Sequence, residues 1–242
     1  MKTPLNIIGI IPARGGSVRV PLKNIRLLAG KPLISYIISA ALQSRYLRRV
    51  IVSTDHPEIK KIALQYGAEV PYGRPKSISG SAVPTISVIK HVVELVEKEE
   101  GKKIDIVVTL QPTSPFCQSK DIDECIELLL KHKTASSAFS AVEIRERPEW
   151  MFRLNKRNCA EPYIPGAMEG KRTVRKFYEK LFIPNGGIYI TTRNALFKEN
   201  AMITKRTALY VMPKERSLDI DEEIDFLFAE LLMKKSVRGD YL

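Results

Sequence analysis

The sequence predicts an α/β fold with a mostly parallel central sheet and helices on both faces. Three observations support this. Short apolar runs alternate with segments of about 10 to 15 residues whose apolar positions repeat at helical spacing, the rhythm of βαβ units. Each apolar run has the length of a buried strand. The chain has 242 residues and is 44% hydrophobic, which is enough for the core of one large domain.

The elements of the first half follow this alternation. An isoleucine-rich run at residues 5–11 predicts a buried strand that stops at Pro12. A loop unusually rich in Lys and Arg follows. A helix is expected after Pro32, because the next apolar residues repeat at helical spacing and proline is favoured at a helix start. A second short strand is expected at residues 50–53.

The alternation continues along most of the remaining chain. Helices are expected at 58–66, 84–97, 121–130 and 222–234, and extended segments at 68–70, 104–110, 136–142, 186–191 and 207–212. Between 143 and 184 the rhythm breaks, with charged residues, prolines and Trp150, the single tryptophan. We interpret 143–184 as an excursion from a single domain spanning 1–242, serving as an arm for dimerisation or substrate binding.

Composition excludes several classes of protein. No run approaches the roughly 18 apolar residues that span a bilayer, and the apolar start is too short for a signal peptide. The 3 cysteines form no CxxC pair, which argues against a zinc site or a disulfide scaffold and favours a cytoplasmic location. The net charge of +12 fits nucleic acid, an anionic substrate or a solvated surface. No helix carries a basic stripe with aromatics, so we expect neither nucleic acid nor membrane as a partner.

The first candidate site follows the first strand. Ligands of open α/β sheets bind beyond the carboxyl ends of the strands, and Gly15 and Gly16 lie there in a loop whose backbone amides can approach an anion. Arg14, Arg19 and Lys23 add positive charge around the same point, as a polyphosphate requires. The spacing matches neither a dinucleotide fingerprint nor a P-loop, and an ordinary surface turn explains the two glycines equally well.

The second candidate is Gln111, which ends a buried strand in a segment with prolines at 112 and 115. Prolines fix the backbone and would hold the Gln111 amide over the crevice as a donor and acceptor. A tight turn with a helix cap near Ser119 explains the same residues without a functional role.

The third candidate is the pair Asp219 and Asp221, before the last helix. Residues two apart in an extended segment face the same way, so both carboxylates can bind one hard divalent cation. Alternatively, Asp221 caps the helix expected at 222. The three histidines are scattered, and no nucleophilic triad is present. We therefore expect an electrostatic mechanism.

Taken together, the segments resemble the acylneuraminate cytidylyltransferase family, the CMP-sialic acid synthetases and relatives that activate other ulosonic acids. The resemblance covers nearly the whole chain. It is carried by Ile8-Gly-Ile-Ile-Pro-Ala-Arg-Gly-Gly-Ser17, Pro21-Leu-Lys-Asn24, Ala29-Gly-Lys-Pro-Leu33, Val52-Ser-Thr-Asp55, Tyr66-Gly-Ala-Glu-Val70, Arg74-Pro75, Leu110-Gln-Pro-Thr-Ser-Pro115, Asn185-Gly-Gly-Ile-Tyr189 and Arg216-Ser-Leu-Asp-Ile-Asp221.

The resemblance implies a Rossmann-like, glycosyltransferase-A-type nucleotidyltransferase fold and a homodimer in which an arm of each subunit reaches the partner's site. It implies magnesium-dependent transfer of CMP from CTP to the anomeric hydroxyl of an acidic nine-carbon or eight-carbon sugar, with release of pyrophosphate. The implied roles are Arg14, Ser17 and Lys23 on the triphosphate, Asn24, Arg74 and Thr85 around cytosine and ribose, Gln111 and Arg175 on the sugar, and Asp219 and Asp221 on magnesium.

Departures from the family pattern cluster on the sugar side and on one phosphate contact. Most relatives have a lysine where this chain has Val18, and Arg19 is a candidate substitute. Relatives often have arginine at the position of Cys117, and some have a basic residue at that of Trp150. Two alternatives stay open at this point: a nucleotidyltransferase for another base or acceptor, and a basic nucleic-acid-binding protein.

Overall fold

The computed structural model describes residues 5–17, 19–166 and 179–237. The chain divides into two compact units, the larger formed by Met1–Ala141 with Pro184–Leu242 and the smaller by Val142–Ile183. The boundaries of the smaller unit lie within two residues of the excursion expected from the sequence.

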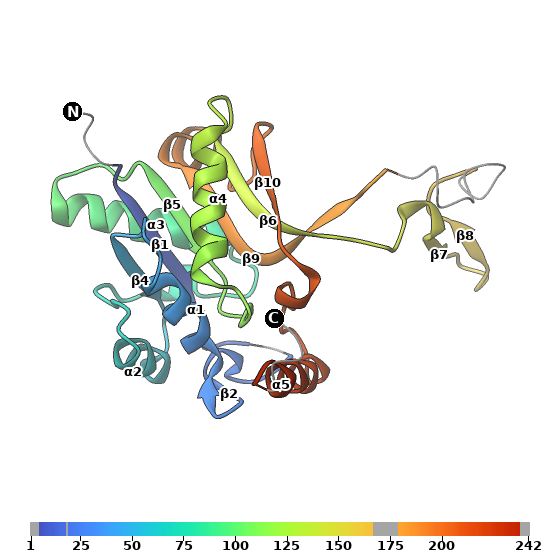
Figure 1. Ribbon diagram of the computed structural model, residues 1–242, viewed down its shortest axis with the longest axis horizontal. Helices are drawn as coiled ribbons and strands as arrows, with labels where there is room; N and C mark the ends of the chain where they lie inside the picture. The colour runs from blue at the N-terminus through green and yellow to red at the C-terminus, as the bar shows by residue number, and fades with distance from the viewer. Residues whose placement is uncertain (1–4, 18, 167–178, 238–242) are drawn as a thin grey trace. The chain divides into compact units, whose positions relative to one another are not determined.

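The larger unit is built on a six-stranded sheet with the strand order β10-β6-β9-β5-β1-β4 (Figure 1). The strands are β1 Ile7–Pro12, β4 Arg49–Ser53, β5 Ile106–Leu110, β6 Ser137–Glu143, β9 Phe182–Thr192 and β10 Thr207–Val211. β1 pairs in parallel with both β4 and β5, and β10 pairs in parallel with β6. β9 runs antiparallel to β5. The predicted α/β class with a mostly parallel sheet is confirmed.

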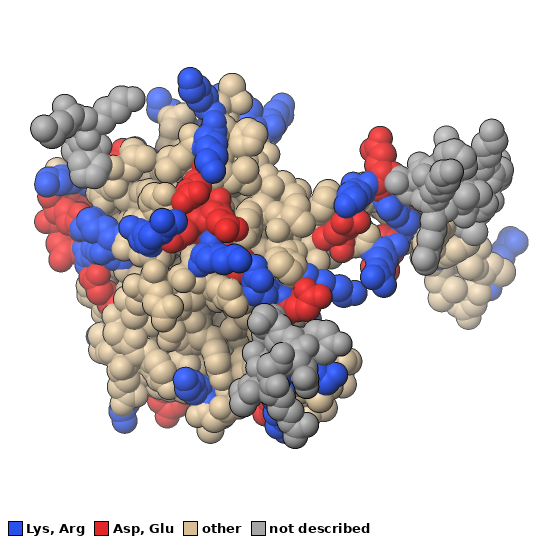
Figure 2. All heavy atoms as spheres, viewed as in Figure 1, with Lys and Arg blue, Asp and Glu red and all other residues tan. Residues whose placement is uncertain are grey.

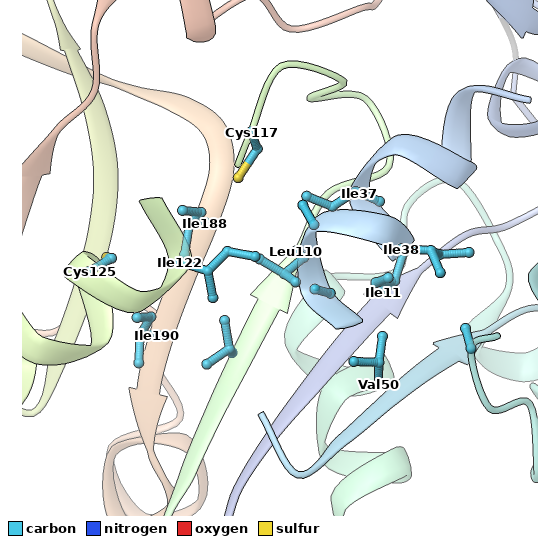
Figure 3. Close-up of a cluster of buried hydrophobic side chains, with 14 of the residues drawn as sticks. Ile11, Ile37, Ile38, Val50, Leu110, Cys117, Ile122, Cys125, Ile188 and Ile190 are labelled. Carbon is cyan, nitrogen blue, oxygen red and sulfur yellow. The ribbon is translucent and has the colours of Figure 1, made fainter. Parts of the chain in front are cut away.

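Helices cover both faces of this sheet. The covering helices are α1 Leu33–Leu42, α2 Pro57–Gln65, α3 Thr85–Glu100 and α4 Ser119–Lys131, whereas α5 Glu223–Val237 packs on the loop after β1. Successive side chains of a strand point to opposite faces. On β1, Ile7 and Ile11 therefore pack with α1, α2 and α4 in one cluster (Figure 3), whereas Ile8 and Ile10 pack with α3 in a second. The short apolar runs thus form strands buried on both sides.

Two local details differ from the expected elements. The extended segment at 68–70 is reduced to one parallel bridge, between Glu69 and Ile51, and follows a turn at Gly67, whose φ is +89°. The N-cap of α4 is Gln118 rather than a serine. The Gln118 side chain accepts from the backbone N–H of Asp121, whose own side chain accepts from the Gln118 N–H.

A third apolar cluster joins α5 to the cationic loop. A short hairpin, β2 Leu27–Leu28 with β3 Lys31–Pro32, lies within that loop. Leu28 is fully buried in a cluster with Ile220, Phe226 and Phe116. This packing holds the loop after β1 against the segment that precedes α5, two stretches about 200 residues apart in sequence.

The smaller unit contains the antiparallel pair β7 Phe152–Leu154 and β8 Ala160–Pro162. The Asn155 side chain closes this hairpin by accepting from the backbone N–H groups of Arg157 and Cys159. Six large apolar side chains in the described part of this unit are at least one-third exposed: Met151, Phe152, Leu154, Tyr163, Ile164 and Ile183.

The surface charge is distributed rather than gathered. On the face shown in Figure 2, Lys and Arg side chains lie beside Asp and Glu side chains. Many form ion pairs, such as Arg45 with Asp123 and Arg48 with Glu100. Most of the basic excess therefore belongs to a solvated surface. None of the helices in the described part of the chain is long and apolar enough to cross a membrane.

Candidate active site

The site is built at the carboxyl ends of β1 and β5, which are parallel neighbours and therefore end at the same edge of the sheet. The loop after β1, the segment after β5 and the segment before α5 meet there. They enclose a cavity of about 360 Å³ lined by Pro12, Arg14, Ser17, Arg19, Val20, Lys23, Asn24, Gln111, Pro112, Thr113 and Asp221. Three of these side chains are cationic and one is anionic, so the cavity carries a positive charge.

The loop after β1 is held by specific contacts at its glycines. The Gly15 N–H donates to Asp55 Oδ1 at 3.0 Å. A Cβ at Gly15 would lie 2.7 Å from a ring carbon of His56, so only glycine fits there without movement of that ring. The Asn24 side chain is buried and donates to the Arg14 carbonyl at 3.0 Å. Asn24 thus ties one end of the loop to the other, and it also lines the cavity.

Lys23 and Asp221 form the centre of the cavity's charge arrangement. Lys23 Nζ donates to the Ile220 carbonyl at 2.6 Å and to Asp221 Oδ1 at 2.8 Å. Arg19 Nη1 lies 3.3 Å from Asp221 Oδ2. The hydrogen bond from Lys23 lowers the pKa of the Asp221 carboxyl, so this group is ionised at neutral pH.

Asp221 is not the cap of α5. The carboxylate at the start of α5 belongs to Asp225, whose Oδ2 accepts from the backbone N–H groups of Asp221 and Glu222, each at 2.8 Å. The capping alternative weighed for Asp221 is therefore wrong, because its side chain points to Lys23 and Arg19 instead.

A second cavity of about 240 Å³ adjoins the first. It is lined by Pro12, Arg14, Arg74, Ser81, Val83, Thr85, Val88 and Gln111. Arg74 is nearly buried and donates from Nε and Nη2 to the Ile78 carbonyl. Burial lowers the pKa of the Arg74 guanidinium from its ordinary value. Arg14 and Gln111 line both cavities, which therefore form one continuous site.

Asp219 lies beside this site in a half-buried position. In the described part of the chain, its Oδ1 is buried and has no hydrogen-bond partner. Burial raises the pKa of the Asp219 carboxyl. A buried acceptor without a donor is costly and suits a cation ligand, so the donor set fits a hard divalent ion. Asp219 is not among the residues lining either cavity, whereas Asp221 lines the first.

The segment before α5 is anchored by a network that the sequence did not reveal. Arg216 donates from Nε and Nη2 to the two oxygens of Asp121, at 3.0 and 2.7 Å, and the Asp121 side chain is fully buried. The Asn185 amide donates to Ser217 Oγ at 3.0 Å. These bonds fix the backbone two and three residues before Asp219, and Arg216 and Asn185 are thus positioning residues. In the sequence, these two residues stand out only because they lie in the segments that carry the family resemblance.

Gly186 is packed directly against Asp219, and its replacement tests how tightly that carboxylate is held. Its φ is +78°, and an added Cβ would lie 2.9 Å from Asp219 Oδ2. We expect Gly186→Ala to lower the free energy of unfolding by about 1–3 kcal/mol, through backbone strain and this contact. Chemical denaturation measures the loss. Gly73→Ala is the control, since Gly73 has an ordinary φ and no atom within 4 Å of a Cβ; equal stabilities of the two variants would contradict the packing described.

The structure brings most of the predicted site residues together. Its two cavities collect eight of them: Arg14, Ser17, Lys23, Asn24, Arg74, Thr85, Gln111 and Asp221. Arg175 lies outside the described residues. Sequence reasoning assigned no role to Thr113, which follows Gln111 and whose carbonyl accepts from the Ile220 N–H at 2.9 Å. Within the described ranges, no group of three or more His, Cys, Asp or Glu residues could by itself hold a metal ion.

Comparison with known proteins agrees with this geometry. Residues 8–227 match the protein family described as Cytidylyltransferase. The chain is 37% identical over 235 residues to the CMP-N,N'-diacetyllegionaminic acid synthase of Legionella pneumophila, covering 95% of this chain and 97% of that protein. It is 32% identical over 225 residues to the pseudaminic acid cytidylyltransferase of Campylobacter jejuni, covering 93% of this chain and 95% of that one.

A solved structure shows the same fold. The CMP:2-keto-3-deoxy-manno-octonic acid synthetase complexed with CTP aligns with a TM-score of 0.67 at 19% identity, covering 96% of this chain and 99% of that chain. The family match spans most of the chain and the two relatives are similar over nearly their whole lengths, which confirms the resemblance drawn from the sequence. The chain belongs to the cytidylyltransferase family.

Proposed function

We propose that this protein transfers CMP from CTP to the anomeric hydroxyl of a nonulosonic acid and releases pyrophosphate. The observation that carries the proposal is the pair of adjoining cavities joined by Arg14 and Gln111. One has the cations for a triphosphate, and the other has the size and the hydrogen-bonding groups for a nucleoside. The names of the two relatives, which act on legionaminic and pseudaminic acids, support the acceptor class.

The residues of the site would act by binding and orientation. Arg14, Ser17 and Lys23 would hold the triphosphate, with the loop amides at Gly15 and Gly16 behind them. Asn24, Arg74 and Thr85 would surround cytosine and ribose, and Gln111, with Arg175, would contact the sugar. In-line attack of the anomeric oxygen on the α-phosphorus would form the new P–O bond as the bond to pyrophosphate breaks, and the proton of the hydroxyl would pass to solvent water. Fixed positive charge stabilises the negative charge that develops on the leaving group, so the step needs no histidine.

A divalent cation, which we propose to be magnesium, would be held by Asp219 and Asp221. The unpartnered Oδ1 of Asp219 supports this, because it is a buried oxygen ligand without a donor. When bound, the ion would supply charge neutralisation at the phosphate oxygens. The protein's own part is to keep Asp219 dry and oriented through the anchors at Arg216 and Asn185.

The proposed reaction is tested by pyrophosphate release. The purified protein is given magnesium, one of CTP, UTP, GTP or ATP, and one of N-acetylneuraminate, legionaminate or pseudaminate. We expect release with CTP and at least one acid, and none when either substrate is omitted. A folded protein that releases no pyrophosphate with CTP and any of the acids would contradict the proposal. If pyrophosphate were released faster with UTP, GTP or ATP, the protein would use that nucleotide instead of CTP.

We also propose that the protein forms a homodimer through the smaller unit and works in the cytoplasm. Exposed apolar side chains close together in one small unit are typical of an interaction surface. Leu154 is 71% exposed, for example, and Phe152 is 52% exposed. An exposed free thiol at Cys159 is compatible with a reducing compartment.

The dimer proposal predicts a mass of two chains in solution, lost when this surface is charged. We expect Phe152→Glu/Leu154→Glu to sediment as a monomer at micromolar concentration, because burying two unpaired carboxylates opposes association. Leu64→Glu on α2, where Leu64 is 51% exposed, is the control and should remain a dimer. The proposal would be contradicted if the unmodified protein were a monomer, or if Leu64→Glu weakened the dimer as much as the double variant does.

A further inference from the structure

The anion-binding cations of the first cavity already have an anionic partner. Asp221 accepts from Lys23 at 2.8 Å through Oδ1 and lies 3.3 Å from Arg19 through Oδ2. Lys23 is well shielded, with 12% of its side chain exposed, and its Nζ also donates to the Ile220 carbonyl. Arg14, the third cation of this cavity, donates instead to the Gly80 carbonyl. A carboxylate therefore occupies the donors that the proposed triphosphate would use.

This arrangement poses a physical conflict for nucleotide binding. A triphosphate entering the cavity competes with Asp221 for these cations, because two of the three N–H groups of Lys23 and the Nη1 of Arg19 already face protein acceptors. Asp221 would then be left as an ionised carboxylate beside a polyanion, which is unfavourable. The conflict is relieved if Asp221 gains a cation of its own as the phosphate oxygens arrive.

We propose that Asp221 exchanges partners: it holds Lys23 and Arg19 in the nucleotide-free protein and moves to the divalent cation when the triphosphate takes these two side chains. This inference rests on the proposed function of the site and adds an order of events to it. Arg19 thereby gains a role, as a residue that binds Asp221 in one state and phosphate in the other.

The exchange makes a thermodynamic prediction. When the divalent ion is absent, Asp221 competes with the nucleotide for Lys23 and Arg19. When the ion is bound, Asp221 no longer competes. The ion and the nucleotide therefore raise each other's affinity, and the coupling is reciprocal. Removing the charge of Asp221 removes the competitor and the ion's ligand together. The coupling should then largely disappear.

Isothermal titration of CTP into the full-length protein tests this, in buffer with EDTA and in buffer with magnesium. We expect Asp221→Asn to bind CTP in EDTA about five- to tenfold more tightly than the unmodified protein, the size expected for two released ion pairs. Magnesium should tighten CTP binding to the unmodified protein by more than about tenfold and to Asp221→Asn by less than about threefold.

Two further variants separate the exchange from a simple loss of negative charge. Glu215→Gln removes an exposed carboxylate six residues before Asp221 that forms no ion pair with Lys23 or Arg19 among the described residues. It should leave CTP binding in EDTA within about twofold of the unmodified protein. Arg19→Gln should weaken CTP binding in magnesium more than in EDTA. This side chain is 63% exposed, so the variant is expected to fold even if Asp221→Asn does not.

The outcomes distinguish the exchange from the proposed function. CTP binding to the unmodified protein in magnesium, with no tightening in Asp221→Asn in EDTA, would overturn the exchange and leave the proposed function standing. The exchange would also be overturned if Glu215→Gln tightened CTP binding as much as Asp221→Asn does, or if Arg19→Gln weakened CTP binding equally in both buffers. No CTP binding to the unmodified protein in either buffer would overturn both.

Discussion

Replacing Lys23 with methionine should lower kcat/KM for CTP by about 100- to 1,000-fold, the cost of removing one preorganised charged donor from a phosphoryl-transfer site. Only 12% of the Lys23 side chain is exposed, against 63% for Arg19, so its charge is less screened by water. Methionine keeps much of the side-chain volume and removes the charge. Steady-state pyrophosphate release at varied CTP measures the effect.

The control for this variant is Lys31→Met, on β3 of the same loop, where the lysine is exposed. Its kcat/KM should stay within about twofold of the unmodified protein. Thermal unfolding of both variants separates a chemical effect from a structural one, since Lys23 also donates to the Ile220 carbonyl. If Lys23→Met unfolds at the same temperature as the unmodified protein and retains more than about one-third of its kcat/KM, Lys23 does not bind the triphosphate.

Replacing Arg216 with methionine should lower the free energy of unfolding by about 3–5 kcal/mol. The variant would leave the fully buried carboxylate of Asp121 without its bidentate partner at the start of α4. Among the described residues, Tyr210 Oη and the Gln118 N–H would still donate to it. Because Arg216 anchors the segment that carries Asp219 and Asp221, turnover should fall as well. Urea denaturation monitored by circular dichroism measures the loss of stability.

Arg206→Met is the matched control for the stability measurement. Arg206 is 60% exposed and lies 3.6 Å from Glu199, so its ion pair is solvated and its loss should cost less than about 1 kcal/mol. If both arginine variants lost the same small amount of stability, the Arg216 pair would not be the anchor described here.

Much of the fold is predictable from the sequence because each element has a local signal. The isoleucines of β1 and the helical spacing of α1 predict their structures without knowledge of their neighbours. The antiparallel direction of β9 has no such signal, since it depends on the path of the chain through the smaller unit. Sequence periodicity identifies a strand but does not give its direction within a sheet.

The candidate site was predictable to a similar degree. Strand ends followed by glycines and cations indicate where an anion would bind, and both cavities lie there. The partners of charged side chains were not predictable, because Lys23 and Asp221 meet across 198 residues of sequence. The same holds for the pair of Arg216 with Asp121, since long-range contacts arise from packing and leave no local pattern.

The central claim is the transfer of CMP to an anomeric hydroxyl, and the balance of products tests it most directly. The protein is incubated with CTP, magnesium and a nonulosonic acid that it turns over. Phosphorus NMR and mass spectrometry then follow both products. We predict one pyrophosphate for each CMP-sugar formed, and no product from the matching 2-O-methyl glycoside, which lacks the attacking hydroxyl. Pyrophosphate released without a CMP-sugar, or equally with the methyl glycoside, would contradict the account.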